Sequence, residues 1–99
     1  MNVLITREDQ SVVATVRGEI DADNCAAFGA DILDGTDQAG RVVVDLSELT
    51  FIDSSGISEL LRLSETVTGR GQDFELRHPS PAVHRVLEIT GLLAHFGLS

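Results

Sequence analysis

A short segment near the middle of the chain places two hydroxyl groups beside a carboxylate. It reads Ile52-Asp53-Ser54-Ser55-Gly56 and is followed by a long helical pattern. A serine at a helix start can accept a hydrogen bond from a backbone N–H group of the first turn, and a serine beside a base can act as a nucleophile. The segment is therefore either a helix cap or a site of serine chemistry, and two adjacent serines are more than one cap requires.

Serine nucleophiles usually work with a histidine base and an acid behind it. The chain has three candidates for the base of Ser54, namely His78, His84 and His95. However, the segment lacks the Gly-x-Ser-x-Gly pattern of a nucleophile elbow, and the chain has no glycine-rich loop with a lysine to hold nucleotide phosphates. We therefore predict that the protein is not an enzyme and that its histidines lie at the surface or at helix ends.

The acidic residues near this segment also have two interpretations. Asp21 and Asp23 precede a helical pattern and either can cap it, while Asp53 can close a tight turn. Alternatively, Asp21 and Asp53 both lie beside Ser54 and hydrogen-bond its hydroxyl. No third carboxylate or histidine has the spacing of a metal ligand, so we expect neither a metal ion nor a cofactor.

The first half of the chain predicts a hairpin, a helix and an interior strand. Residues 3–6 and 11–16 are β-branched runs separated by polar residues, and Gly18 breaks the pattern of the second run. The following helix ends between residues 35 and 40, and residues 41–46 form a nearly continuous apolar run that suits the centre of a sheet. The apolar positions of the helix are Cys25, Phe28, Ile32 and Leu33.

The second half predicts two further helices and two strands. A helix begins at Ser54 after a connection from 47 to 53 and ends at the glycines of 69–71. Residues 73–77 alternate like a half-exposed strand near a sheet edge. Ser80 and Pro81 then start a helix that stops at Gly91, and residues 92–98 form a last strand.

Composition and charge limit the classes of partner. Sixteen acidic residues against seven arginines give a net charge of −9, which disfavours nucleic acid and anionic membranes and suits either a basic protein partner or simple solubility. No segment is long enough to span a bilayer, and no basic, apolar leader is present. Cys25 is the only cysteine, so we expect no intrachain disulfide, a buried thiol and a cytoplasmic protein.

Three motifs in order carry a resemblance to a known family. They are Gly18-Glu19-Ile20-Asp21, then Val44-Asp45-Leu46-Ser47 leading to the segment from Phe51 to Gly56, then Ser80-Pro81-Ala82-Val83 through Leu87 to Gly91-Leu92. From about Val12 to Leu92 the chain resembles the STAS domain of anti-sigma-factor antagonists. The resemblance implies a single α/β domain over residues 1–99, with a mixed sheet of four to five strands packed with three or four helices.

The resemblance also implies a mechanism. In that family the unmodified antagonist binds an anti-sigma factor that is also a serine kinase with an ATP-binding fold, which frees a sigma factor for transcription. Phosphorylation reverses the binding, and a serine phosphatase restores it. The phosphate acceptor maps onto Ser54, and the partner-binding residues map onto Asp21, Asp23, Asp53, Ser54, Ser55 and Gly56.

Members of the same family also have other functions, and this sequence departs from the family pattern in one place. STAS domains also serve as subunits of lipid-transport ATPase complexes, as tails of anion transporters and in stress-sensing assemblies, and a lone domain of this length disfavours the transporter tail. Many relatives continue through a further C-terminal helix, so its absence after Ser99 is expected to expose apolar surface. We expect a monomer or a weak dimer.

Overall fold

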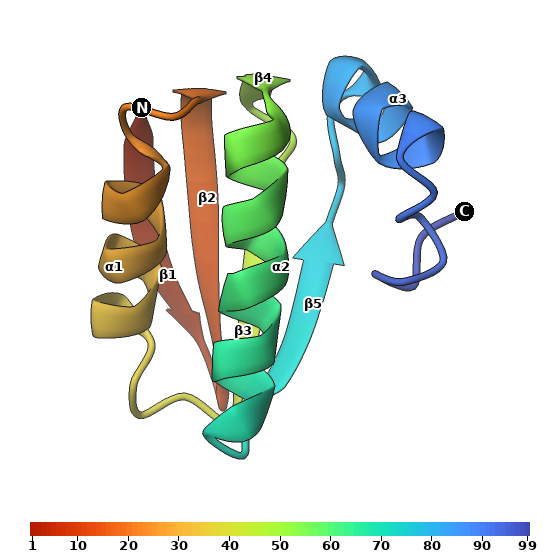
Figure 1. Cartoon of the computed structure of the whole chain (residues 1–99). Helices are drawn as coiled ribbons and strands as arrows, with labels where there is room; N and C mark the ends of the chain where they lie inside the picture. Colours follow the sequence, from red (N-terminus) through yellow and green to blue (C-terminus); the bar gives the residue numbers. More distant parts are fainter.

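A mixed five-stranded sheet organises the computed structural model, which describes all 99 residues (Figure 1). The strands are β1 (Asn2–Glu8), β2 (Ser11–Ile20), β3 (Arg41–Asp45), β4 (Leu49–Ile52) and β5 (Asp73–Arg77). The helices are α1 (Cys25–Gly35), α2 (Ser54–Gly69) and α3 (Pro81–Ile89). The strand order is β1-β2-β3-β5, and β4 pairs with β2 beyond the end of β3. The predicted α/β class, a mixed sheet of four to five strands packed with three or four helices, is confirmed, with five strands and three helices observed.

The N-terminal hairpin is longer than the sequence predicts. β1 and β2 pair antiparallel from Asn2 opposite Arg17 to Glu8 opposite Ser11, so only two residues form the turn. Gly18 does not end β2, and the prediction that it does is wrong. Its φ of 97° lies in a region that glycine adopts freely, and the pairing of β2 with β4 shifts register at this point.

The strand β4 was not predicted. The sequence predicts a connection over its four residues, Leu49 to Ile52, because a run of this length carries little periodicity. In the structure β4 runs parallel to the last part of β2, and Ile52 lies opposite Ile20. This strand determines where the segment that follows it is held.

The core lies between the sheet and the helices α1 and α2, which cover the same face of the sheet in Figure 1. Val42 and Val44 of β3 are fully buried, which confirms the interior position predicted for this strand. The core is largely aliphatic, and Phe28 of α1 is its one fully buried aromatic residue. No helix of the structure is both long enough and apolar enough to cross a membrane.

Residues 92–98 form a turn and not the strand predicted for them. Backbone hydrogen bonds from Phe96 to Leu92 and from Leu98 to Leu93 curl the segment, with N···O distances of 3.2 and 2.7 Å. Its apolar side chains pack against the rim of the core, so hydrophobicity alone gave a misleading indication of an extended strand. The helix α3 before it begins as predicted, with the Ser80 hydroxyl accepting a hydrogen bond from the N–H group of Val83 at 3.4 Å.

Candidate functional site

The ends of two parallel strands bring the acidic residues of the motifs to one edge of the sheet. Ile20 and Ile52 are register partners in β2 and β4, and the N–H group of Asp53 donates to the carbonyl of Ile20 at 3.2 Å. Asp21 and Asp53 each follow the last residue of these strands. The backbone pairing therefore brings the two aspartates to the same edge of the sheet.

Asp53, and not Ser54, caps α2. The Asp53 Oδ1 atom accepts a hydrogen bond from the N–H group of Gly56 at 3.0 Å, and its backbone is extended as an N-cap residue requires. Ser54 is therefore the first helical residue, and the interpretation of Ser54 as the cap is wrong. Its side chain is exposed, while Ser55 beside it is half-buried.

Gly56 lets the start of α2 approach the strand ends closely. A Cβ atom at this position would lie 2.6 Å from Cγ1 of Ile52 and 2.9 Å from Cγ2 of Ile20. Both neighbours are β-branched and restricted in χ1, so they cannot move aside easily. Gly56 is buried and therefore acts as a packing residue, which leaves Ser54 as the exposed hydroxyl of the segment.

The carboxylate of Asp21 organises the turn before α1. Asp21 Oδ1 accepts hydrogen bonds from the N–H groups of Asp23 and Asn24 at 3.0 and 3.2 Å. The side chain of Asn24 returns two bonds, from the Asp21 N–H group at 2.9 Å and to the carbonyl of Glu19 at 2.9 Å. Asn24 occupies the N-cap position and makes no side-chain cap bond. The prediction that Asp21 or Asp23 caps this helix is therefore wrong.

Neither carboxylate hydrogen-bonds the Ser54 hydroxyl. The bonds of Asp21 and Asp53 go to backbone N–H groups of their own turns, which holds both charges in fixed positions near the exposed serine. Asp23 is exposed at the same end of α1. The site therefore presents the exposed Ser54 hydroxyl at a sheet edge where two carboxylates are held by their own turns.

The histidines have contacts away from Ser54. His78 Nδ1 lies 3.9 Å from Asp45, His84 Nε2 lies 2.9 Å from the Ser99 carbonyl oxygen, and the His95 ring packs edge-on against Phe96. No base is placed to activate the serine, and no group of three or more His, Cys, Asp or Glu side chains is arranged to hold a metal ion.

Sequence reasoning missed Phe51. This residue of β4 is 47% exposed and lies opposite Glu19 of β2, two residues before Asp53. The only signal in the sequence is alternation within a strand of four residues, which is too short to identify the exposed face in advance. A large apolar side chain beside the motif is a suitable anchor for a protein partner.

A buried carboxylate connects α1 to α2 behind the site. Glu59 of α2 packs against Gly29 of α1, where an added Cβ atom would lie 2.0 Å from Glu59 Oε1. Arg62 donates to both carboxylate oxygens of Glu59, at 2.6 and 3.1 Å. These hydrogen bonds and the charge of Glu59 raise the pKa of Arg62. Cys25, at the start of α1, is half-buried and not fully buried as predicted.

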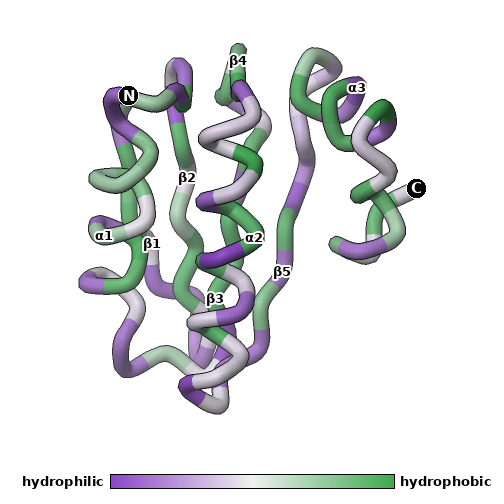
Figure 2. Tube along the Cα trace, in the orientation of Figure 1, coloured by the Kyte–Doolittle hydropathy of each residue, from purple (hydrophilic) through white to green (hydrophobic).

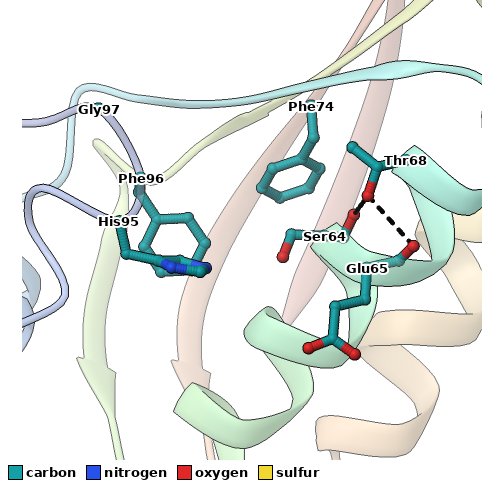
Figure 3. A pocket seen from close by; sticks show the side chains of 7 residues that line it. All are labelled: Ser64, Glu65, Thr68, Phe74, His95, Phe96 and Gly97. Atoms are coloured by element: carbon teal, nitrogen blue, oxygen red, sulfur yellow. Dashed lines mark hydrogen bonds between the residues drawn. The ribbon is translucent and has the colours of Figure 1, made fainter.

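The largest cavity lies away from the motif, between α2, β5 and the C-terminal turn (Figure 3). Its volume is about 440 Å³. The rings of Phe74 and Phe96 line it, with centroids 6.3 Å apart, and Ser64, Glu65, Thr68 and His95 contribute polar groups. No residue of the Asp53–Gly56 segment reaches this cavity, so it is not part of the candidate site.

Comparison with known proteins agrees with the fold. The chain matches the family model described as "Mlab, STAS domain" over residues 3–95. The anti-sigma F factor antagonist of Paenibacillus polymyxa is 30% identical over 96 residues, which cover 93% of this chain and 82% of that protein.

Two solved structures are similar in three dimensions. An anti-sigma factor antagonist from Mycobacterium paratuberculosis superposes with a TM-score of 0.84 at 31% identity, covering 98% of this chain and 83% of that one. The phosphorylated form of the Bacillus cell fate determinant SpoIIAA superposes with a TM-score of 0.69 at 21% identity, covering 96% of this chain and 87% of that one. At this identity the second structure establishes only that the fold is the same.

The packing of Gly56 gives a stability prediction. Gly56→Ala should lower the free energy of unfolding by about 1–3 kcal/mol, because the added methyl group overpacks the contact with Ile20 and Ile52. Gly69→Ala is the matched control, since nothing lies within 4 Å of an added Cβ atom there and alanine favours the helix. Urea denaturation measures both variants, and equal midpoints for Gly56→Ala and the wild type would show that the contact is not tight.

Proposed function

The chain belongs to the STAS domain family, and on this basis we propose that it is an anti-sigma factor antagonist whose binding state is switched by phosphorylation of Ser54. The observation that carries the proposal is the exposed Ser54 hydroxyl at the first residue of α2. Asp53 is occupied as the cap and Gly56 is packed against the strand ends, and of the two serines Ser54 is exposed while Ser55 is half-buried. The resemblance of the motif to the family's acceptor segment supports Ser54 as the position that is modified.

The proposed partner is an anti-sigma factor that is also a serine kinase with an ATP-binding fold. The unphosphorylated chain binds this partner and releases a sigma factor, and a serine phosphatase restores the unphosphorylated form. The name of the Paenibacillus relative supports the antagonist role, and the sequence motif supports the acceptor position. The docking surface comprises Asp21, Asp23, Asp53, Ser54, Ser55 and Gly56, with Phe51 beside it.

In this proposal the chain is a cytoplasmic protein that binds the kinase and is phosphorylated by it. It is not itself an enzyme. Ser54 Oγ attacks the γ-phosphorus of ATP held by the kinase, an O–P bond forms, and the bond from that phosphorus to ADP breaks. The serine proton passes to a base on the kinase, since the carboxylate of the neighbouring Asp53 is occupied as the helix cap. The fixed charges of Asp21 and Asp53 favour a kinase surface that is basic around its active site.

The phosphorylated state keeps the fold and changes the surface. A phosphoserine adds about −1.5 to −2 charges beside Asp53. The N–H groups of Ser54 and Ser55 in the first turn of α2 remain free, because the Asp53 carboxylate accepts only from Gly56. Free N–H groups and the helix dipole stabilise negative charge at the start of a helix. The helix therefore tolerates the phosphate, while the partner meets a dianion where it had met a neutral hydroxyl.

The first test identifies the partner and the modified atom together. Wild-type chain used as bait should capture a soluble kinase that, with ATP, adds one phosphate located at Ser54 by peptide mass spectrometry. Ser54→Ala should abolish the modification, and Ser54→Asp should no longer retain the kinase, because a fixed negative charge imitates the phosphorylated surface. Ser58→Ala is the matched control, since Ser58 is exposed one turn further along α2.

Two outcomes would overturn this assignment in different ways. A phosphate on Ser55 or Ser58 with Ser54 unmodified would show that the acceptor position is wrong. Capture of a transporter ATPase in place of a soluble kinase would instead support the alternative function, a subunit of a lipid-transport complex.

A second test separates the charge of Asp53 from its capping role. Asp53→Asn keeps an oxygen that can accept from the Gly56 N–H group, so the free energy of unfolding should change by less than about 1 kcal/mol. Phosphorylation by the cognate kinase should nevertheless slow about tenfold, which corresponds to about 1.4 kcal/mol of lost charge contact. Asp37→Asn, which removes an exposed charge between α1 and β3, should change neither property. Normal phosphorylation of folded Asp53→Asn protein would limit Asp53 to a structural role.

A further inference from the structure

The two outer strands of the sheet differ in how they are protected. β5 has charges at three of its five positions, Asp73, Glu75 and Arg77, and the C-terminal turn lies beside it. β1 has seven residues and no charged side chain before Arg7. No backbone or side-chain hydrogen bond joins β1 to anything other than β2. An edge strand with a long uncharged stretch, such as residues 2–6 of β1, is a template for pairing with another strand.

Several of the exposed large apolar side chains of the protein belong to this edge strand, with Leu4 and Ile5 on opposite faces of the sheet and Ile5 beside Gly35 of α1. Of the protein's five exposed large hydrophobic residues, three are in or next to β1, namely Met1, Leu4 and Ile5, with 40%, 61% and 37% of their surface exposed. Figure 2 shows the hydrophobic colouring along β1 at the outer edge of the sheet. Burying such side chains is favourable, by roughly 25 cal/mol per Å² of apolar surface.

We propose that β1 is a self-association edge, on which a second copy of the chain adds its own β1 antiparallel about a two-fold axis. A two-fold axis normal to the sheet makes the two strands antiparallel and places the same residues on both sides of the interface. Leu4 and Ile5 lie near the middle of the strand, so each is brought close to its counterpart. The two sheets join into one continuous sheet.

The charge pattern of β1 suits a second copy. In a register centred on Ile5, Arg7 of one copy faces Val3 of the other, and Glu8 faces Asn2, so no like charges are opposed. Only Glu8 of the sixteen acidic residues lies in β1, and Arg7 beside it makes the strand neutral within a chain of net charge −9. The acidic chain can therefore approach itself along this edge with the least repulsion.

The size of the edge predicts a weak dimer. Seven residues at about 3.4 Å each give a contact about 24 Å long and one strand wide, which buries less than the roughly 800 Å² per partner of a standard interface. Pairing at β1 goes beyond the proposed switch, because β1 packs against β2 and α1 while Ser54 begins α2. The dimer would carry two separate Ser54 surfaces.

Sedimentation equilibrium on the whole chain tests the proposal, from about 10 µM to about 1 mM protein. The wild type should show a reversible monomer–dimer equilibrium. Leu4→Lys brings two positive charges together near the two-fold axis and should weaken dimerisation at least about tenfold. Ile89→Lys is the matched control, because Ile89 is 71% exposed on α3, and it should dimerise like the wild type.

Hydrogen exchange of the wild type provides a readout that does not depend on any variant. Amides of residues 2–8 should gain protection as the protein concentration rises. A wild type that is monomeric throughout, a Leu4→Lys variant that dimerises normally, or concentration-dependent protection confined to other strands would each overturn the proposal.

Discussion

The junction between the ends of β2 and β4 is the constraint on which the site depends. A backbone hydrogen bond from Asp53 N–H to the Ile20 carbonyl extends the parallel pairing of β2 and β4 past the last residue of each strand. The absence of a Cβ atom at Gly56 then allows α2 to start directly against Ile20 and Ile52. Because the helix start is held at both points, the orientation of Ser54 relative to Asp21 and Asp53 follows from the packing and needs no bond to the serine itself.

In this arrangement each residue of the motif has a different structural role. Asp53 caps, Gly56 packs and Ser54 is left exposed, so modification of the serine removes neither the cap nor the packing contact. A lost cap costs about 1 kcal/mol, whereas a dianion placed in a fitted interface costs several. The larger effect therefore falls on binding, which is the property that a switch must change.

Much of the fold could be predicted, because its clearest elements carry strong local signals. The run of branched residues in β3, the helical spacing of α2 and the Ser80-Pro81 start of α3 each identify one element without help from tertiary contacts. Elements that depend on tertiary contacts were missed. β4 is a strand only because β2 extends past Gly18 to pair with it, and the turn after α3 is held by its own backbone bonds and by packing on the core.

The candidate site was predictable in position but not in detail. The motif located Asp53, Ser54 and Gly56, yet the choice of Asp53 over Ser54 as the cap depends on where the helix begins, and sequence patterns place helix ends only to within a few residues. The exposure of Phe51 could not be predicted, since it depends on the pairing of an unrecognised strand.

Titration calorimetry of the unphosphorylated and Ser54-phosphorylated chains against the captured kinase tests the central claim most directly, with circular dichroism of both forms recorded alongside. The account predicts superimposable spectra and an affinity that falls by two to three orders of magnitude on phosphorylation, the equivalent of about 3–4 kcal/mol. Equal affinities for the two forms, or a phosphorylated chain that has lost its secondary structure, would contradict it.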